Sequence, residues 1–375
     1  MKLFKALCLC VSVLQCVVLM AQERPHRPVH TFSIVARDPQ TGEMGAAVQS
    51  HWFSVGSNVI WAEAGVGAVA TQSFIDPSYG PLGMALMKAG KSAPEALKSL
   101  LAGDSGQAVR QVAFVDAKGN VMSWTGAGDM PAAGTIVPNR TDTMKLGCGG
   151  GQDCAKLCPQ KDPKLLQPCG GYAEIGKDFS AQANLMANDK IWPAMAKAYQ
   201  ESKGDLAERM LAALEAAQAV GGDIRGRQSA AIIIVKAQSS GQPWKDKVFD
   251  LRVDDAAEPI KELRRLVTLQ RAYNHMNAGD HAVELGDHEL ALKEYSTAED
   301  TAAKAEGVLP SRVAEMMYWH AVELVNINRV DESLPLFKKA FAMEKGWIEL
   351  TPRLLKVGLL PNDPKLLERI LSQSK

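Results

Sequence analysis

The residue with the clearest chemical potential in this sequence is Thr31, which opens the apolar run Thr-Phe-Ser-Ile-Val-Ala. The turn sequence Arg-Asp-Pro-Gln-Thr-Gly and a second apolar segment, Glu43 to Ser50, follow it, and this pattern predicts a β-hairpin. A threonine at the start of a chain can attack an amide with its hydroxyl while its own α-amine takes the proton. Thr31 is therefore a candidate nucleophile if the chain is cut in front of it. The alternative is a β-branched residue that merely begins a strand.

The first 21 residues have the features of an export signal. Lys2 and Lys5 precede an uncharged apolar stretch, Leu7 to Met20, and Ala21 is a small residue suited to cleavage. The stretch is shorter than the roughly 20 residues that a helix needs to cross a bilayer. We therefore expect an exported protein, periplasmic or secreted, without a membrane span. Residues 22–30 would then form a leader, or a propeptide whose removal exposes Thr31.

Four of the seven cysteines lie within one segment rich in glycine and proline, at about residues 147–170. In an exported protein such a group favours two disulfides, although the spacing does not decide which cysteines pair. The segment lacks the closely spaced cysteine pairs of zinc sites, so a metal is the weaker interpretation. The four candidates are Cys148, Cys154, Cys158 and Cys169.

Three polar residues at strand positions could assist Thr31. Ser33 lies two residues along the same strand and therefore on the same face as Thr31. Gln72 ends an apolar strand and Asn184 follows another, so either amide could donate to an oxyanion or to a substrate. The alternative for each of them is a structural hydrogen bond to a neighbouring backbone group.

A cluster of charged and polar residues precedes the apolar strand predicted at residues 229–235. It consists of Asp223, Arg225, Arg227 and Gln228. The planar guanidinium group of an arginine suits a substrate carboxylate, so this cluster could contribute to substrate binding. The alternative is a salt-bridged turn.

Composition excludes several classes of function. The 42 basic and 42 acidic residues balance, and such a balance gives no electrostatic footprint for nucleic acid. The predicted strand domain has no histidine pair at metal-binding spacing beside a carboxylate and no phosphate-binding glycine loop. We therefore expect no metal and no cofactor.

The order of elements predicts two parts. From residue 31 to 237, apolar strands and helices alternate in a pattern that suits two packed sheets with helices outside. A polar stretch, residues 238–258, is predicted to be a linker, and residues 259–375 are almost entirely helical. Within them, segments 286–298 and 329–340 place small, aromatic and small residues at the same relative positions, which is typical of tetratricopeptide (TPR) repeats. Two such repeats are few for independent stability, so we expect them to pack on the first domain or on another subunit.

Five motifs resemble a known family. They are Thr31-Phe-Ser-Ile-Val-Ala-Arg-Asp, Gly65-Val-Gly-Ala-Val-Ala-Thr-Gln72, Asp76-Pro-Ser-Tyr-Gly80, Arg110-Gln-Val and Gly222-Asp-Ile-Arg-Gly-Arg-Gln-Ser-Ala-Ala231. As a set they resemble the family labelled domain of unknown function 1028, whose members resemble N-terminal-nucleophile (Ntn) hydrolases in fold. The resemblance covers about residues 31–237 and implies an α+β protein with a four-layer αββα sandwich. The helical residues 259–375 resemble the TPR-like tail of some members.

The sequence departs from the family pattern at two places. Family members often begin at or near the equivalent of Thr31, whereas Gln22 to His30 would precede it here, and the cysteine-rich segment resembles an insertion. Two functions remain as hypotheses. The first is an Ntn-type amidohydrolase for a small amide or peptide, and the second is a non-catalytic scaffold whose TPR-like tail binds a peptide, a glycan or a protein partner. Self-association through the tail is compatible with both.

Overall fold

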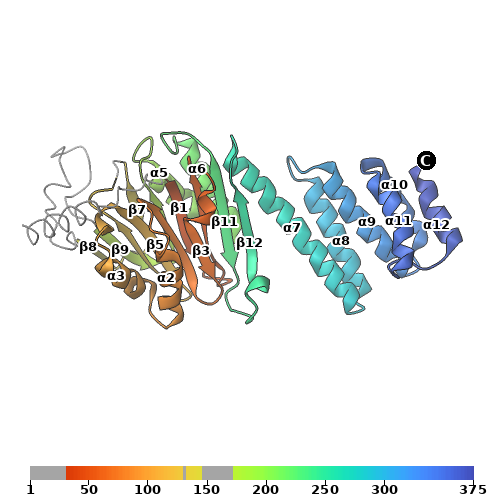
Figure 1. The fold of residues 1–375 in the computed structure, drawn as a ribbon, viewed down its shortest axis with the longest axis horizontal. Coiled ribbons are helices and arrows are strands. Elements are labelled where there is room, and N and C mark those ends of the chain that lie inside the picture. The colour runs from red at the N-terminus through yellow and green to blue at the C-terminus, as the bar shows by residue number, and fades with distance from the viewer. Residues whose placement is uncertain (1–30, 130–131, 146–171) are drawn as a thin grey trace, which may run out of the picture.

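The computed structural model describes residues 31–129, 132–145 and 172–375. The expected signal, the leader and the four candidate disulfide cysteines lie outside the described residues. These described residues contain two six-stranded antiparallel sheets and ten α-helices, many of them in the C-terminal part (Figure 1). The prediction of a mixed α and β protein with a helical C-terminal part is confirmed. Within the described chain, no helix combines the length and the apolar character needed to cross a membrane.

The first sheet is built around the hairpin predicted at its centre. Thr31 of β1 pairs with Ser50 of β2, and Asp38 closes the turn by accepting from the backbone of Gln40 at 2.8 Å. Gly42 completes the turn at φ +75°, a conformation that glycine adopts without strain. In spatial order the strands are β12 (Lys247–Val253), β11 (Ser229–Val235), β2 (Met44–Ser50), β1 (Thr31–Arg37), β10 (Phe179–Ala183) and β7 (Gly134–Ile136).

The second sheet packs face to face with the first. Alanines and valines of both sheets, with Val35 and Ala46 from the first and Ala70 and Val115 from the second, form a buried apolar cluster between them. The strands are, in spatial order, β3 (Ile60–Glu63), β4 (Gly67–Ser73), β5 (Arg110–Asp116), β6 (Asn120–Thr125), β9 (Tyr172–Lys177) and β8 (Asp142–Lys145).

Helices cover the outer faces of both sheets. Helices α5 (Ile191–Glu201) and α6 (Leu206–Ala219) pack on the first sheet, and α2 (Tyr79–Lys88) and α3 (Ala93–Gly103) pack on the second (Figure 1). A capping box starts α3, because the Ser92 side chain accepts from the Glu95 backbone while the Glu95 carboxylate accepts from the Ser92 backbone.

The stretch predicted as a linker, residues 238–258, supplies a strand to the first sheet. Strand β12 pairs with β11 along its length at the sheet edge, and it mixes charged with apolar residues because only Phe249 and Val253 of this strand are buried. Helix α7 (Pro259–Glu284) then packs on this edge, where Leu263 and Val267 are fully buried in the core of the first sheet. The sandwich therefore extends beyond the expected boundary and into the first helix of the tail.

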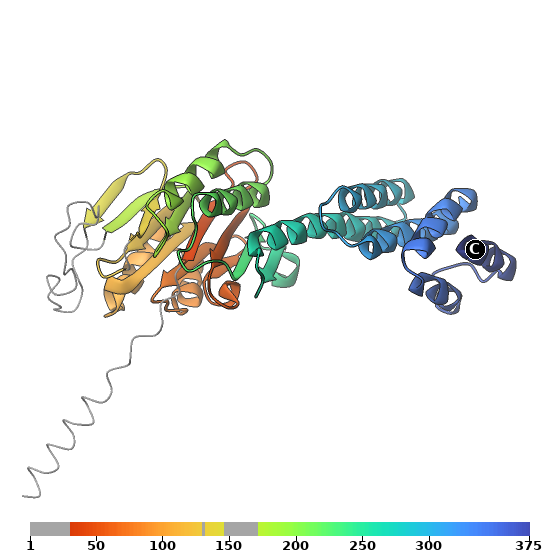
Figure 2. The ribbon, with the colours of Figure 1, turned by 90° about the horizontal axis from the view of Figure 1, so that it is seen from above.

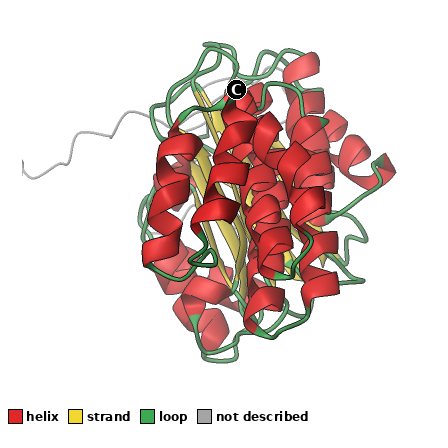
Figure 3. Ribbon diagram, turned by 90° about the vertical axis from the view of Figure 1, so that its right-hand side faces the viewer, coloured by secondary structure: helices red, strands yellow, loops and turns green. Residues whose placement is uncertain are grey.

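The tail continues away from the sheets as successive helices (Figure 2). Figure 3 shows these helices in front of the two sheets. The small, aromatic and small positions noted in the sequence are all buried, and Tyr295 packs against Gly279 of α7 while Phe337 packs against Tyr318 of α9. The remaining helices are α8 (His288–Ala303), α9 (Pro310–Asn326), α10 (Val330–Met343), α11 (Gly346–Lys356) and α12 (Pro364–Leu371).

Candidate functional site

Thr31 lies at the head of β1, between the ends of its two neighbouring strands. Ser50 of β2 is opposite it on one side, and Asn184, the residue after β10, is beside it on the other. The backbone amide of Asn184 donates to the carbonyl oxygen of Thr31 at 3.1 Å. Thr31 has no exposed surface. The Thr31 side chain is therefore closed to a substrate in this structure.

Gln72 of β4 connects Thr31 to the second sheet. Its Nε2 atom donates to the carbonyl oxygen of Thr31 at 3.1 Å and to Oε1 of Gln111 at 2.6 Å. Its Oε1 atom accepts from the hydroxyl of Ser33 at 2.7 Å. Both amide hydrogens of Gln72 are therefore in use, and this side chain holds the backbone of Thr31 in place.

Gln111 of β5 is the centre of the network, and sequence reasoning missed it as a site residue. Its Nε2 atom lies 3.0 Å from the carbonyl oxygen of Ala183, 3.3 Å from that of Gly134 and 3.0 Å from the hydroxyl of Thr125. Its Oε1 atom accepts from Gln72 and also from Nδ2 of Asn184, at 3.0 Å. The available signal was a fully buried polar residue within an apolar strand.

Gln182 of β10 completes the group that we call the amide network, which consists of Ser33, Gln72, Gln111, Gln182 and Asn184. Nε2 of Gln182 donates to the hydroxyl of Ser33 at 3.2 Å and to the carbonyl oxygen of Ala70 at 3.4 Å. All five side chains are fully buried. The oxygens Oε1 of Gln182 and Oδ1 of Asn184 have no hydrogen-bond donor among the residues that the structure describes.

Two backbone features hold the amides of this network in position. Ser73 and Leu185, which directly follow Gln72 and Asn184, have positive φ values of 70° and 52°. Such values are uncommon in residues other than glycine and persist only where the surroundings impose them. The hydroxyl of Ser73 donates to Asp129 at 2.5 Å, which anchors the end of β4.

An ion-pair cluster connects the chain just after Gln72 to the start of β5. Arg110 donates to Asp104 at 2.8 Å and to the carbonyl oxygen of Phe74 at 2.5 Å, and the hydroxyl of Tyr79 donates to Asp104 at 3.0 Å. Burial opposes ionisation of Asp104, but hydrogen bonds from Arg110 and the Gly106 amide outweigh it and lower the pKa of Asp104. Burial and the Asp104 carboxylate both raise the pKa of Tyr79. The motif residues Tyr79 and Arg110 therefore support the site without touching Thr31.

The second predicted cluster lies at the same end of the sandwich. The carboxylate of Asp223 accepts from the backbone of His51, the residue after Ser50, at 3.0 Å. The same carboxylate binds the Arg225 side chain through two hydrogen bonds, of 3.0 and 2.6 Å. Arg227 pairs with Glu258, and Gln228 contributes backbone hydrogen bonds to Ser50 and Ala256. This geometry favours a salt-bridged turn near the site over a guanidinium group available to a substrate carboxylate.

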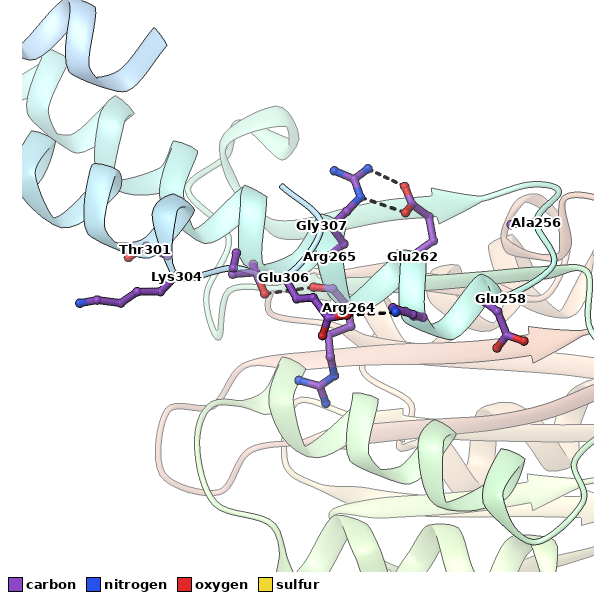
Figure 4. Close-up of a pocket in the computed structure, with 12 residues that line it drawn as sticks. Ala256, Glu258, Glu262, Arg264, Arg265, Thr301, Lys304, Glu306 and Gly307 are labelled. Atoms are coloured by element: carbon purple, nitrogen blue, oxygen red, sulfur yellow. Dashed lines mark hydrogen bonds and ion pairs between the residues drawn. The ribbon is translucent and has the colours of Figure 1, made fainter. Parts of the chain in front are cut away.

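One groove of the described structure lies away from Thr31. It has a volume of about 820 Å³ and runs between α7 and the segment that follows α8 (Figure 4). Its charged residues are paired, for example Lys261 with Glu306 at 3.0 Å and Arg265 with Glu262 at 2.5 Å. Over the described ranges, no group of three or more His, Cys, Asp or Glu residues is placed to hold a metal ion.

The fold and this site define a mixed α/β protein of two facing antiparallel sheets, with buried amides gathered at the head of a central hairpin. A model of the family of unknown function DUF1028 matches residues 31–143 and 166–263. The match covers more than half of the chain, so the protein belongs to this family, as the sequence motifs predicted.

Comparison with other proteins adds one solved structure. The crystal structure of protein SPO2555 from Silicibacter pomeroyi, also a DUF1028 protein, shares 24% sequence identity with this chain at a TM-score of 0.45. The similarity covers 63% of this chain and 87% of that one. No curated protein matches the chain. The chemistry of the site must therefore be argued from its own residues.

Proposed function

We propose that this protein is an exported Ntn-type amidohydrolase that cleaves a small amide or peptide, with Thr31 as its nucleophile. The observation that carries the proposal is the position of Thr31, at the head of a central strand and between two sheets whose outer faces are covered by helices. Hydrogen bonds from Gln72 and Asn184 hold its carbonyl oxygen at 3.1 Å each. Such an arrangement holds one threonine rigidly at the head of the central strand.

The reaction that we propose has three steps. Cleavage in front of Thr31 first frees its α-amine. The Thr31 hydroxyl then attacks the substrate carbonyl, its proton passes through the α-amine to the departing nitrogen, and an acyl ester forms on Thr31. Water finally hydrolyses that ester, which releases the acid and restores the hydroxyl. Asn184 supports the attack because, among the described residues, only Gln111 accepts from its amide group, which leaves a second amide hydrogen for the oxyanion.

The test of this function begins with the intact mass and N-terminal sequence of the protein recovered from its exported compartment. We expect a chain that starts at Thr31, and we expect an activated ester or amide probe to add an acyl group to that residue. Thr31→Ala should abolish the acylation, whereas Thr41→Ala, which changes an exposed threonine in the turn, should leave it intact. A chain that starts at Gln22 and never acylates Thr31 would contradict the proposal.

A second function is favoured by one observation, the complete burial of Thr31 in the full-length chain. If the leader stays in place, the sandwich is a scaffold and the tail is the part that binds. A groove of about 470 Å³ between α8, α9 and α10 has apolar walls from Leu292, Leu324 and Leu336, beside the charged residues Arg329 and Glu332. Peptide binding by an unprocessed chain, lost when Leu292 and Leu336 are replaced by aspartate, would support this alternative.

A further inference from the structure

The donors and acceptors of the amide network are determined by the backbone around it. A glutamine amide can be placed in two orientations, and its partners decide which one is present. Nε2 of Gln111 lies 3.0 Å from the carbonyl oxygen of Ala183 and 3.3 Å from that of Gly134, and carbonyl oxygens only accept. Gln111 therefore donates through Nε2 and accepts through Oε1.

This orientation determines that of Asn184. Because Oε1 of Gln111 accepts, the Asn184 atom 3.0 Å away must be the donor Nδ2. The other side-chain atom of Asn184, Oδ1, is then an acceptor. It is buried and has no donor within the described part of the chain. A buried carbonyl oxygen without a donor is costly, so this atom is expected to have a partner in the functional state.

The residue opposite Asn184 carries a group whose number of hydrogens changes on cleavage, the α-nitrogen of Thr31. Phe32 is opposite Ala183 in the sheet, so Thr31 is opposite Asn184, whose backbone amide donates to the Thr31 carbonyl. Residues in such a pair have their Cα atoms about 5.5 Å apart and their side chains on the same face. A peptide nitrogen carries one hydrogen, whereas a terminal ammonium group carries three, and the added hydrogens need acceptors.

We propose that Oδ1 of Asn184 is the acceptor that binds and orients the α-amine of Thr31 once the chain has been cut in front of it. This inference rests on the proposed function and gives Asn184, through its oxygen atom, a positioning role besides the one proposed for its amide nitrogen. The bond would turn the lone pair of the amine towards the Thr31 hydroxyl, from which it must take a proton. Gln182 carries a second acceptor of the same kind, but it lies opposite Ser33, two residue pairs away from Thr31.

The experiment measures the protonation of the α-amine directly. The full chain is folded with a protease site in place of the residues before Thr31, cut there, and labelled with a small amine-reactive reagent at a series of pH values. Mass spectrometry of the N-terminal peptide then gives the pKa of the α-amine. An acceptor stabilises the ammonium form, so we expect Asn184→Ala to lower the pKa of the α-amine by about one pH unit. The α-amine of this variant should then be labelled about tenfold faster than that of the wild type at pH 6. Asn184→Asp, which keeps the shape of the side chain, should raise the pKa.

Gln182→Ala is the matched control, because it removes the neighbouring unpaired acceptor and should leave the pKa of the α-amine unchanged. If the α-amine has the same pKa in the wild type and in folded Asn184→Asp, the inference is overturned. The Asn184→Asp protein also replaces Asn184→Ala in this test if Asn184→Ala does not fold. The two proposals fail separately. A pKa that responds to Asn184 in a protein that never acylates Thr31 would uphold the inference and contradict the amidohydrolase. If Thr31 is acylated but the pKa of its α-amine is the same in the wild type and in the Asn184 variants, the amidohydrolase proposal is upheld and the inference is overturned.

Discussion

At the scale of single residues, the site depends on buried glutamine side chains that are linked by hydrogen bonds. Gln111 makes contacts with two side-chain amides, one hydroxyl and two backbone carbonyls, so it links both sheets beneath Thr31. Each of these contacts replaces a hydrogen bond to water that is lost on burial. The network is therefore a requirement for folding as well as for the catalysis proposed above, and variants within it should be tested for both.

Gln111→Leu is predicted to destabilise the protein strongly. Leucine preserves most of the volume but provides no partner for the amides of Gln72 and Asn184, so the free energy of unfolding should fall by about 3 kcal/mol or more. Urea unfolding monitored by the fluorescence of Trp124, which is buried in the second sheet, gives the measurement. Gln40→Ala, at an exposed turn position, should change stability by less than about 0.5 kcal/mol. A loss below about 1 kcal/mol in Gln111→Leu would contradict this role.

Glu43, at the start of the second strand segment, is predicted to make stability depend on pH. Burial, followed by repulsion from Asp205 and Asp38, raises the pKa of Glu43 in the folded protein. The folded state then holds the proton more tightly than the unfolded state, so ionisation of Glu43 destabilises the fold as the pH rises through the folded pKa. Glu43→Gln should therefore be more stable than the wild type at pH 7, by less than about 1 kcal/mol because the group is half exposed.

The difference between the two proteins should shrink as the pH falls and Glu43 becomes protonated. Thermal unfolding of both proteins from pH 7 down to pH 3 measures this trend. A Glu43→Gln protein that is less stable than the wild type at pH 7 would show that the carboxylate makes a favourable contact instead.

At the scale of elements, close packing rather than propensity governs the helix pairs of the tail. Gly279 lies inside α7, where alanine would ordinarily be the better helix former by roughly 0.5–1 kcal/mol. A Cβ atom at this position would lie 2.7 Å from the ring of Tyr295, which is closer than real contacts allow. Tyr295 is itself held by a hydrogen bond of 2.7 Å to Asp280. The ring therefore has little freedom to move away.

Gly279→Ala is accordingly predicted to weaken the contact between α7 and α8 by roughly 1–3 kcal/mol, despite the gain in propensity. Amide hydrogen exchange should become faster in both helices. Gly103→Ala, at the end of α3 with open space around the added Cβ atom, provides the control and should be neutral or stabilising. Unchanged exchange in α7 and α8 would mean that the two helices can separate slightly at little cost.

At the scale of the whole molecule, the sandwich and the tail share a helix. The first half of α7 belongs to the core of the first sheet, and Arg264 on this helix forms ion pairs with Glu208 and Glu215 of α6. The second half pairs with α8. A cut at the boundary expected from the sequence would therefore damage the sandwich instead of releasing an independent tail.

A chain that ends at Glu258 is predicted to be much less stable than one that ends at Gly307, after α8. The shorter chain loses the burial of Leu263 and Val267, each worth about 1.5–3 kcal/mol, so a difference of roughly 4 kcal/mol is expected. Unfolding in urea, measured on both chains, provides the comparison. Equal stability of the two would show that the sandwich does not need α7.

Much of the local structure followed from short-range patterns. The hairpin at Thr31 to Ser50, the capping box at Ser92 and the strand at Ser229 to Val235 were all predictable, because turn chemistry, capping and apolar runs act between residues close in sequence. Strand β12 was not predictable in the same way. An edge strand is only partly buried and therefore carries the polar residues that also mark a linker.

The sequence by itself determined the family and the mixed α and β class, and it identified Thr31 as the candidate nucleophile. Only the tertiary structure decided which side chains surround that residue. Gln72, Gln111 and Gln182 are separated by dozens of residues and meet only because two sheets stack face to face. That stacking also decided which amide atoms donate and which accept. Hydrogen bonding between distant side chains depends on three-dimensional placement, which the pattern of residue types along a chain does not encode.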